Sequence, residues 1–126
     1  MKIKTFKPTY KREDGLTVIY DSSIPFPGGI EIKVRGIVVF PPGAKGGNHK
    51  HPRIEAFYSP GALTVVWIDK DGKKHKESMS PRGGKFRLFI TKPGEPHAII
   101  NNTNREISLV EYANEEQYGV EAVSVA

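Results

Sequence analysis

The sequence contains no cysteine, only one tryptophan and no long hydrophobic run. Without cysteine, the chain cannot carry a disulfide framework, a cysteine zinc finger, an iron–sulfur cluster or a thiol nucleophile. The longest apolar runs, such as residues 37–40, are far shorter than the ~20 residues that a membrane-spanning helix needs. The N-terminal residues MKIKTFKPTYKRED lack the apolar stretch of a signal peptide. We therefore expect a soluble, cytoplasmic protein that does not enter a membrane.

Charge of one sign is not concentrated in any segment that would bind nucleic acid. The 19 Lys and Arg residues exceed the 14 Asp and Glu residues by five, but they are scattered along the chain. No aromatic–basic RNA-binding pattern, KH loop or basic helix is present. We interpret the excess as a solvated surface and expect no nucleic-acid partner. A length of 126 residues predicts a single domain over 1–126, with residues 1–34 supplying its N-terminal strands.

The chain also lacks any sustained apolar period of 3.6 residues, so no helix is predicted. Short β-type runs bounded by Gly, Pro, Asn and Asp take its place. The Asp71–Gly72 pair between two of these runs predicts a hairpin, because both residues accept the positive φ of a tight turn. Many short strands at this spacing favour an all-β sandwich, barrel or jelly roll. The expected strands cover 16–20, 30–40, 49–51, 55–59, 62–69, 73–79, 86–91, 97–101, 106–113 and a stretch near 120–125.

The expected strand 62–69 is apolar on both of its faces. Leu63, Val65 and Trp67 share one side, whereas Val66 and Ile68 lie on the other. A strand with two apolar faces is typical of a position covered on both sides.

Three of the four histidines lie beside turns within β-type sequence and predict a metal site. His49 and His51 leave the same face of an extended chain about 6.6 Å apart, which one ion can bridge. Glu55 would lie about 13 Å further along a straight strand, but Pro52 marks a bend that can return it. His97 follows a tight turn downstream and supplies a third imidazole. His75, within a lysine-rich hairpin, is interpreted as a solvated side chain and left out of the site.

Three neutral imidazoles and one carboxylate form a mixed nitrogen and oxygen ligand set. Such a set suits Zn, Ni, Fe or Mn and leaves coordination positions open for water or substrate. We therefore predict a divalent transition metal as cofactor.

At these residues the sequence resembles the cupin family. The first cupin motif, G-x5-H-x-H-x3,4-E-x6-G, matches residues 43–61 with its last glycine, Gly61, one residue early. The second, G-x5-P-x-G-x2-H-x3-N, matches residues 86–101 with phenylalanine at its first position and the proline displaced by one place. The matching residues are Gly43, His49, His51, Glu55, Gly94, His97 and Asn101. The resemblance implies a double-stranded β-helix, the cupin jelly-roll barrel, with a metal bound by His49, His51, Glu55 and His97.

Two shorter stretches narrow this resemblance. GNHKH at 47–51 and YANE at 112–115 are similar to the GNHxH and WANE segments of cupin domains in sugar-nucleotide enzymes. These include bifunctional capsular-polysaccharide epimerase/reductases and deoxysugar ketoisomerases. The resemblance implies a metal that polarises an oxygen of a keto-sugar or sugar-nucleotide while a protein base shifts the adjacent proton.

Candidate catalytic residues lie on the expected strand 106–113. Glu111 shares one face with Leu109, and Tyr112 lies on the other face; the pattern leaves open which face points into the barrel. A carboxylate in apolar surroundings would have a raised pKa, as a general base requires. The side chains expected to bind substrate are Arg35, Arg53, Phe57 and Arg87.

Two other classes of function remain compatible with the same ligands. One is a non-haem metal dioxygenase or decarboxylase, and the other is a non-catalytic cupin that binds a sugar or another small molecule. All three have a small-molecule ligand as partner. Barrels of this type often pair through an edge strand, so we also expect a homodimer, with residues 2–6 as a candidate for exchange.

Overall fold

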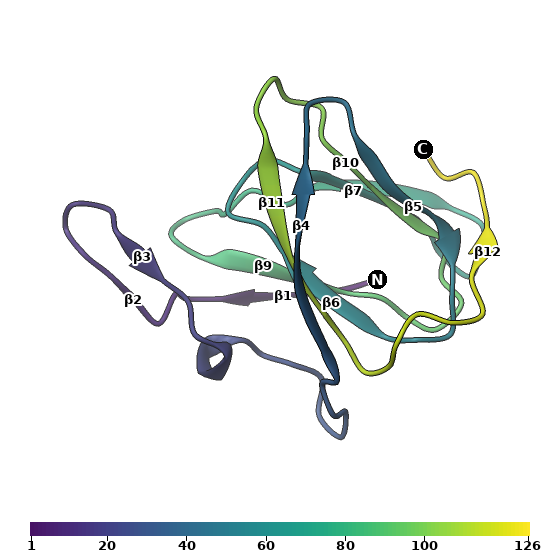
Figure 1. Ribbon diagram of the computed structural model, residues 1–126, viewed down its shortest axis with the longest axis horizontal. Coiled ribbons are helices and arrows are strands. Elements are labelled where there is room, and N and C mark those ends of the chain that lie inside the picture. Colours follow the sequence, from purple (N-terminus) through teal and green to yellow (C-terminus); the bar gives the residue numbers. More distant parts are fainter.

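The computed structural model describes residues 1–126, and nearly all of its regular structure is antiparallel β-strand. Two five-stranded sheets form the body of the molecule (Figure 1). The first has the order β1 (Lys2–Phe6), β9 (Phe86–Ile90), β6 (Glu55–Tyr58), β11 (Ile107–Ala113) and β4 (Val34–Phe40). The second has the order β12 (Glu121–Ala122), β5 (Lys45–Lys50), β10 (His97–Ile100), β7 (Thr64–Ile68) and β8 (Lys74–Ser78). The predicted all-β jelly-roll fold is confirmed.

The inner faces of the two sheets enclose the main core. Alternation along each strand sends one set of side chains inward, because successive side chains of a strand point to opposite faces. The nine residues of this core come from both sheets and the loops beside them: Phe40, Phe57, Leu63, Val65, Trp67, Met79, Phe89, Ile99 and Leu109. Functional side chains on the same faces therefore point into the barrel.

Part of the outer face of each sheet is covered as well. Residues from the N-terminal segment, including Ile24 and Phe26, pack over the outer side of β6, β9 and β11. On the second sheet, Val66 and Ala98 pack against Val125 near the C-terminus. This cover explains why strand 62–69 is apolar on both faces, as the sequence pattern predicted.

The N-terminal region differs most from the expected strands. A small hairpin of β2 (Tyr10–Lys11) and β3 (Thr17–Val18) stands away from the barrel (Figure 1), followed by a short 3-10 helix at Asp21–Ser23. The strand expected over 30–40 begins only at Val34, and the one expected over 49–51 is β5, which begins earlier. The segment 2–6 forms β1 and pairs with β9 of its own chain. No helix in the structure has the length and apolar character needed to cross a membrane.

Candidate metal centre

A β-bulge between β5 and β10 sets the direction of the first histidine. His97 lies opposite His49, but Ala98 lies opposite Gly47, so Asn48 is the extra residue. Gly47 and Asn48 both have positive φ, 84° and 57°. A Cβ on Gly47 would lie 2.8 Å from the carbonyl oxygen of His97, a contact that only glycine avoids. The bulge thus brings two ligand strands close together and aims His49 into the barrel.

The chain beyond His51 bends as the proline predicted. β5 ends at Lys50, and β6 begins at Glu55 in the other sheet, so the bend carries the chain from one sheet to the other. Glu55 then points inward, since it has the same parity as the core residue Phe57. The ligand atoms of His49, His51, Glu55 and His97 all lie within 4.8 Å of one another. The four residues that the sequence singled out therefore meet at one point.

Two of the imidazoles are oriented by backbone carbonyl groups. Nδ1 of His51 lies 3.1 Å from the carbonyl oxygen of Arg53, and Nδ1 of His97 lies 2.9 Å from that of Glu95. A carbonyl oxygen only accepts hydrogen bonds, so each Nδ1 carries the proton, and in the neutral ring Nε2 presents a lone pair. Both Nε2 atoms lie 3.1 Å from the same oxygen of Glu55, Oε1. Lone pairs that face a carboxylate oxygen at this distance repel it, and a cation bound between them would remove that repulsion.

The donor set fits a metal ion on these grounds. Two ligands that bind one Zn-sized ion at ~2.1 Å are at most about 4.2 Å apart, so the cluster needs only small side-chain movements to close around it. Such carbonyl contacts to the second ring nitrogen are the usual means of fixing metal-ligating histidines. His49, His51, Glu55 and His97 could hold a divalent metal; the geometry does not select among Zn, Ni, Fe and Mn.

Electrostatics keep these groups in the form that binds metal. Burial by itself would raise the pKa of Glu55, but the hydrogen bonds that His51 and His97 donate when Nε2 carries a proton in place of a metal outweigh burial and hold the pKa well below its usual range. Burial also lowers the pKa of His49, and the neighbouring imidazoles add to this effect. The carboxylate is therefore ionised and His49 is neutral at pH 7, as metal ligation requires.

A buried arginine and a second carboxylate adjoin the ligands. Arg53 donates to Glu55 Oε2 from both Nε (3.1 Å) and Nη2 (2.5 Å). Nη2 also lies 3.3 Å from Oε1 of Glu111. Burial raises the pKa of Glu111, and the charge of Glu55 adds to the rise against the opposing effect of Arg53. Because Glu111 shares a face with the core residue Leu109, the face of β11 that points into the barrel is the one carrying Glu111.

The centre borders a cavity of about 200 Å³. Its lining combines ligand residues and Glu111 with an apolar wall and a glycine pair. Arg53 is the only lysine or arginine in that lining. The remaining lining residues are Val38, Phe40, Gly46, Gly47, Ile99, Leu109 and Gln117. Gln117 was missed by the sequence analysis, since an exposed loop residue carries no periodic signal.

The other candidate residues lie away from this cavity. Phe57 is only 1% exposed and belongs to the core, with its ring 6.5 Å from that of His97. Arg35 is exposed and pairs with Asp21 on the outer side. Arg87 donates to Glu77 and to the carbonyl oxygen of Ser78, and its guanidinium lies over Phe89.

Tyr112 does not reach the metal centre either. It lies on the outer face of β11 in the cluster beneath the N-terminal segment. Its hydroxyl donates to Asp21 Oδ1 at 2.8 Å, and burial together with this bond raises its pKa. The phenol therefore serves the packing of the N-terminal segment.

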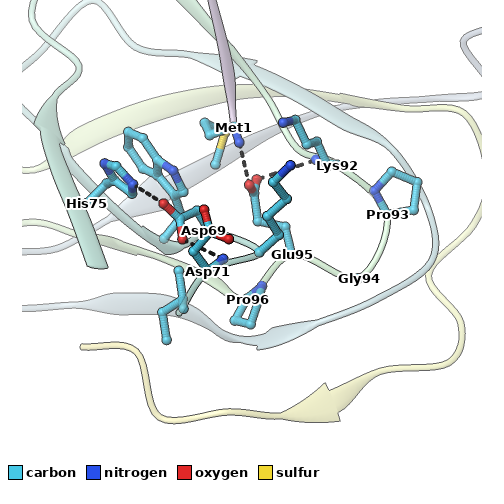
Figure 2. A pocket seen from close by; sticks show the side chains of 12 residues that line it. Met1, Asp69, Asp71, His75, Lys92, Pro93, Gly94, Glu95 and Pro96 are labelled. Carbon is cyan, nitrogen blue, oxygen red and sulfur yellow. Dashed lines mark hydrogen bonds and ion pairs between the residues drawn. The ribbon is translucent and has the colours of Figure 1, made fainter. Parts of the chain in front are cut away.

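His75 is not the solvated side chain that the sequence suggested. Its ring stacks on Trp67 with centroids 5.0 Å apart, and Nε2 lies 2.8 Å from Oδ2 of Asp69. These residues line a second cavity, of about 480 Å³, in which Glu95 also pairs with the N-terminal amino group of Met1 (Figure 2). In strand register, His75 lies opposite Trp67, and Trp67 lies opposite His97. His75 is thus two strands away from the metal ligands and outside their cluster.

Comparisons with known proteins place this geometry in context. No protein-family model matches the sequence, and no curated protein matches it. Solved structures match in fold. The capsular polysaccharide assembling protein CapF from Staphylococcus aureus superposes with a TM-score of 0.63 at 16% identity, over 85% of this chain and 37% of that one. Oxalate oxidase bound to the substrate analogue glycolate gives a TM-score of 0.58 at 23% identity, over 71% of this chain and 45% of that one.

A mutant of Bacillus subtilis oxalate decarboxylase OxdC also matches, with a TM-score of 0.58 at 18% identity over 70% of this chain. This chain spans less than half the length of each of these three proteins, 37%, 45% and 23% respectively. At these identities the likeness concerns the fold, which is the double-stranded β-helix of the cupins.

Proposed function

We propose that this protein is a metal-binding cupin that isomerises or epimerises a small carbohydrate-type substrate, either a keto-sugar or the sugar end of a sugar-nucleotide. The observation that carries the proposal is the position of Glu111. It lines the same cavity as the ligands His49, Glu55 and His97 and has a raised pKa. A carboxyl group tuned in this way suits proton transfer beside a metal-bound oxygen.

The charges that line the cavity support a neutral polar substrate. Arg53 is the only basic side chain in the lining apart from the histidines, and it is already engaged with Glu55 and Glu111. A dicarboxylate such as oxalate would therefore find no free side-chain cation and would face Glu111. A polyhydroxy ketone carries no charge that needs neutralising, and Gln117 offers an amide to its hydroxyl groups.

The size of the cavity limits what can enter. Its volume of about 200 Å³ lies below the ~300–1,000 Å³ typical of pockets for drug-sized ligands. Only the sugar portion of a sugar-nucleotide would occupy it, and the nucleotide would lie outside the mouth. The fold likeness to CapF, described as a capsular polysaccharide assembling protein, supports the carbohydrate class.

In the proposed reaction, a metal held by the four ligands supplies Lewis-acid polarisation of the substrate oxygen. Glu111 removes the proton on the carbon next to the carbonyl, and the electron pair of that C–H bond moves toward the carbonyl oxygen. The same carboxyl group then delivers the proton to the former carbonyl carbon, as the hydroxyl proton of the first carbon passes to the former carbonyl oxygen, which completes an isomerisation. Return of a proton to the first carbon on its opposite face would instead complete an epimerisation. Arg53 holds Glu111 beside the cavity, and the apolar side chains of Phe40 and Leu109 limit the access of water.

Solvent isotope exchange tests this proposal. Protein loaded separately with Zn, Ni, Fe or Mn is incubated in deuterium oxide with a panel of keto-sugars and sugar-nucleotides. We expect deuterium at the carbon next to the carbonyl, measured by mass spectrometry and NMR. Glu111→Gln keeps the size of the side chain and changes none of the metal ligands, so it should retain metal and lose the exchange.

Two other results would contradict the proposal. Oxygen consumption or carbon dioxide release without isotope exchange would assign the protein to the dioxygenase or decarboxylase class. Saturable sugar binding by the metal-loaded protein without exchange would assign it to the non-catalytic class.

We also propose that the protein is a homodimer, and a comparison of the edge strands of the two large sheets supports one surface for it. The edge strand β8 carries Lys74 and Lys76, and edge lysines oppose pairing between molecules. The edge strand β4 instead exposes Ile37 (70%) and Val39 (50%). Since β1 is already paired with β9, a second copy at β4 accounts better for the exposed apolar groups than exchange of β1.

A further inference from the structure

We infer that Arg53 is a positioning residue that orients the ligand Glu55 toward the metal, and that it does not bind substrate. This inference rests on the proposed metal-binding function. It replaces the substrate-binding role expected for Arg53 from the sequence. The argument depends on which oxygen of Glu55 each neighbour contacts.

The two oxygens of Glu55 have separate partners. Oε1 faces Nε2 of His51 and of His97, at 3.1 Å each. Oε2 receives both the Nε and the Nη2 hydrogen bonds of Arg53. This division leaves Oε1 as the ligand atom and keeps Oε2 turned away from the position of the metal. Glu55 is only 6% exposed, so protein groups surround its carboxylate.

Arg53 is itself fixed by contacts beyond Glu55. Nη1 donates to the carbonyl oxygen of Glu115 at 3.2 Å, and Nη2 contacts Glu111 at 3.3 Å. The guanidinium thus makes four hydrogen bonds with its five donors, and the residue is 6% exposed. A guanidinium held on three sides cannot swing out to meet a substrate, but it can hold a carboxylate in one orientation.

The backbone of Arg53 contributes to the same centre. Its carbonyl oxygen accepts from Nδ1 of His51 and so directs Nε2 of that ring toward Glu55. One residue therefore orients two of the four ligands, through different groups. Substituting its side chain removes the contacts to Glu55, Glu111 and the carbonyl oxygen of Glu115, but leaves the carbonyl contact to His51 in place.

Three variants separate charge from geometry. Arg53→Met keeps the length of the side chain and removes its charge and donors. Arg53→Lys keeps the charge but lacks the planar fork that holds one oxygen from two nitrogens. Arg35→Met is the matched control, since Arg35 forms an ion pair with Asp21 on the outer side. Circular dichroism establishes which variants are folded.

Each protein is titrated with Co²⁺, whose visible absorption bands report the number and arrangement of ligands. We expect Arg53→Met to bind Co²⁺ about 10–100-fold more weakly than the wild type, the usual cost of removing a partner of a metal ligand. The Co²⁺ affinity of Arg53→Lys should lie between those of the wild type and Arg53→Met, and its absorption bands should differ from those of the wild type. Arg35→Met should match the wild type in both measurements.

Other outcomes would overturn the inference. Wild-type affinity and bands in Arg53→Met, or wild-type bands in Arg53→Lys, would show that the guanidinium does not position Glu55. If Arg53→Met does not fold, the bands of Arg53→Lys decide the question. A wild-type protein that binds no Co²⁺ would instead remove the proposed metal function and this inference with it.

Discussion

Replacing His97 with alanine should sharply weaken metal binding, because this residue joins the two halves of the ligand set. His97 comes from the second motif, and its ring centroid lies 5.0 Å from that of His49 and 4.9 Å from that of His51. It is only 2% exposed, so its Nε2 is held in place before any metal arrives. The substitution leaves three ligands and a hole that water can fill.

The expected loss can be worked out per ligand. Four-ligand zinc sites in small domains bind with roughly 10–16 kcal/mol. An equal share per ligand is about 3 kcal/mol, and since ~1.4 kcal/mol corresponds to a factor of ten, affinity should fall at least ~100-fold. Competition with a chromophoric chelator measures the affinity, and elemental analysis measures the metal retained after purification.

His75→Ala is the matched control for His97→Ala. Both histidines belong to the same sheet, but His75 lies two strands away and pairs with Asp69. We expect His75→Ala to keep the affinity of the wild type within about twofold, whichever metal is used. Folded His97→Ala with nearly unchanged affinity, or an equal loss in both variants, would refute the assignment of the ligands.

Two further predictions concern the bulge and the β4 edge. Gly47→Ala should lower both the melting temperature and the metal affinity, because the added Cβ would lie 2.8 Å from the carbonyl oxygen of His97. Gly43→Ala is the matched control, since Gly43 also has a positive φ (79°) but open space around it. It should lose only the ~1 kcal/mol of stability that backbone strain costs, with unchanged metal affinity. Equal metal affinity in the two glycine variants would contradict this role of the bulge. Ile37→Lys should convert a dimer to a monomer in sedimentation experiments; a wild-type protein that sediments as a monomer at tens of micromolar would exclude pairing through β4.

The metal ligands could be predicted from sequence because their signal is local. The spacing of His49 and His51 fixes their common face, Pro52 marks the bend, and a turn precedes His97. Each of these features depends on a few neighbouring residues and on strand geometry. The likeness to cupin motifs then supplied what local reasoning lacks, namely that the two segments meet.

The surroundings of the ligands depend on contacts between distant segments and could not be predicted. Arg53 appears in the sequence as a polar residue beside a proline, with nothing to show that Glu111, 58 positions away, lies beside it. The inward face of β11 was equally undetermined, because the N-terminal segment covers the outer face and makes both faces partly apolar. His75 was misjudged for a similar reason, since its stacking on Trp67 depends on the register of β7 and β8.

The single tryptophan gives this protein a built-in optical probe. Trp67 lies directly opposite His97 in the strand register, so it is one strand away from a metal ligand. A nearby ion with a partly filled d shell quenches the fluorescence of indole, whereas a closed-shell ion such as Zn²⁺ does not. Emission from one residue, recorded without labels or added dyes, would therefore distinguish a protein filled with Ni, Fe or Mn from one filled with zinc.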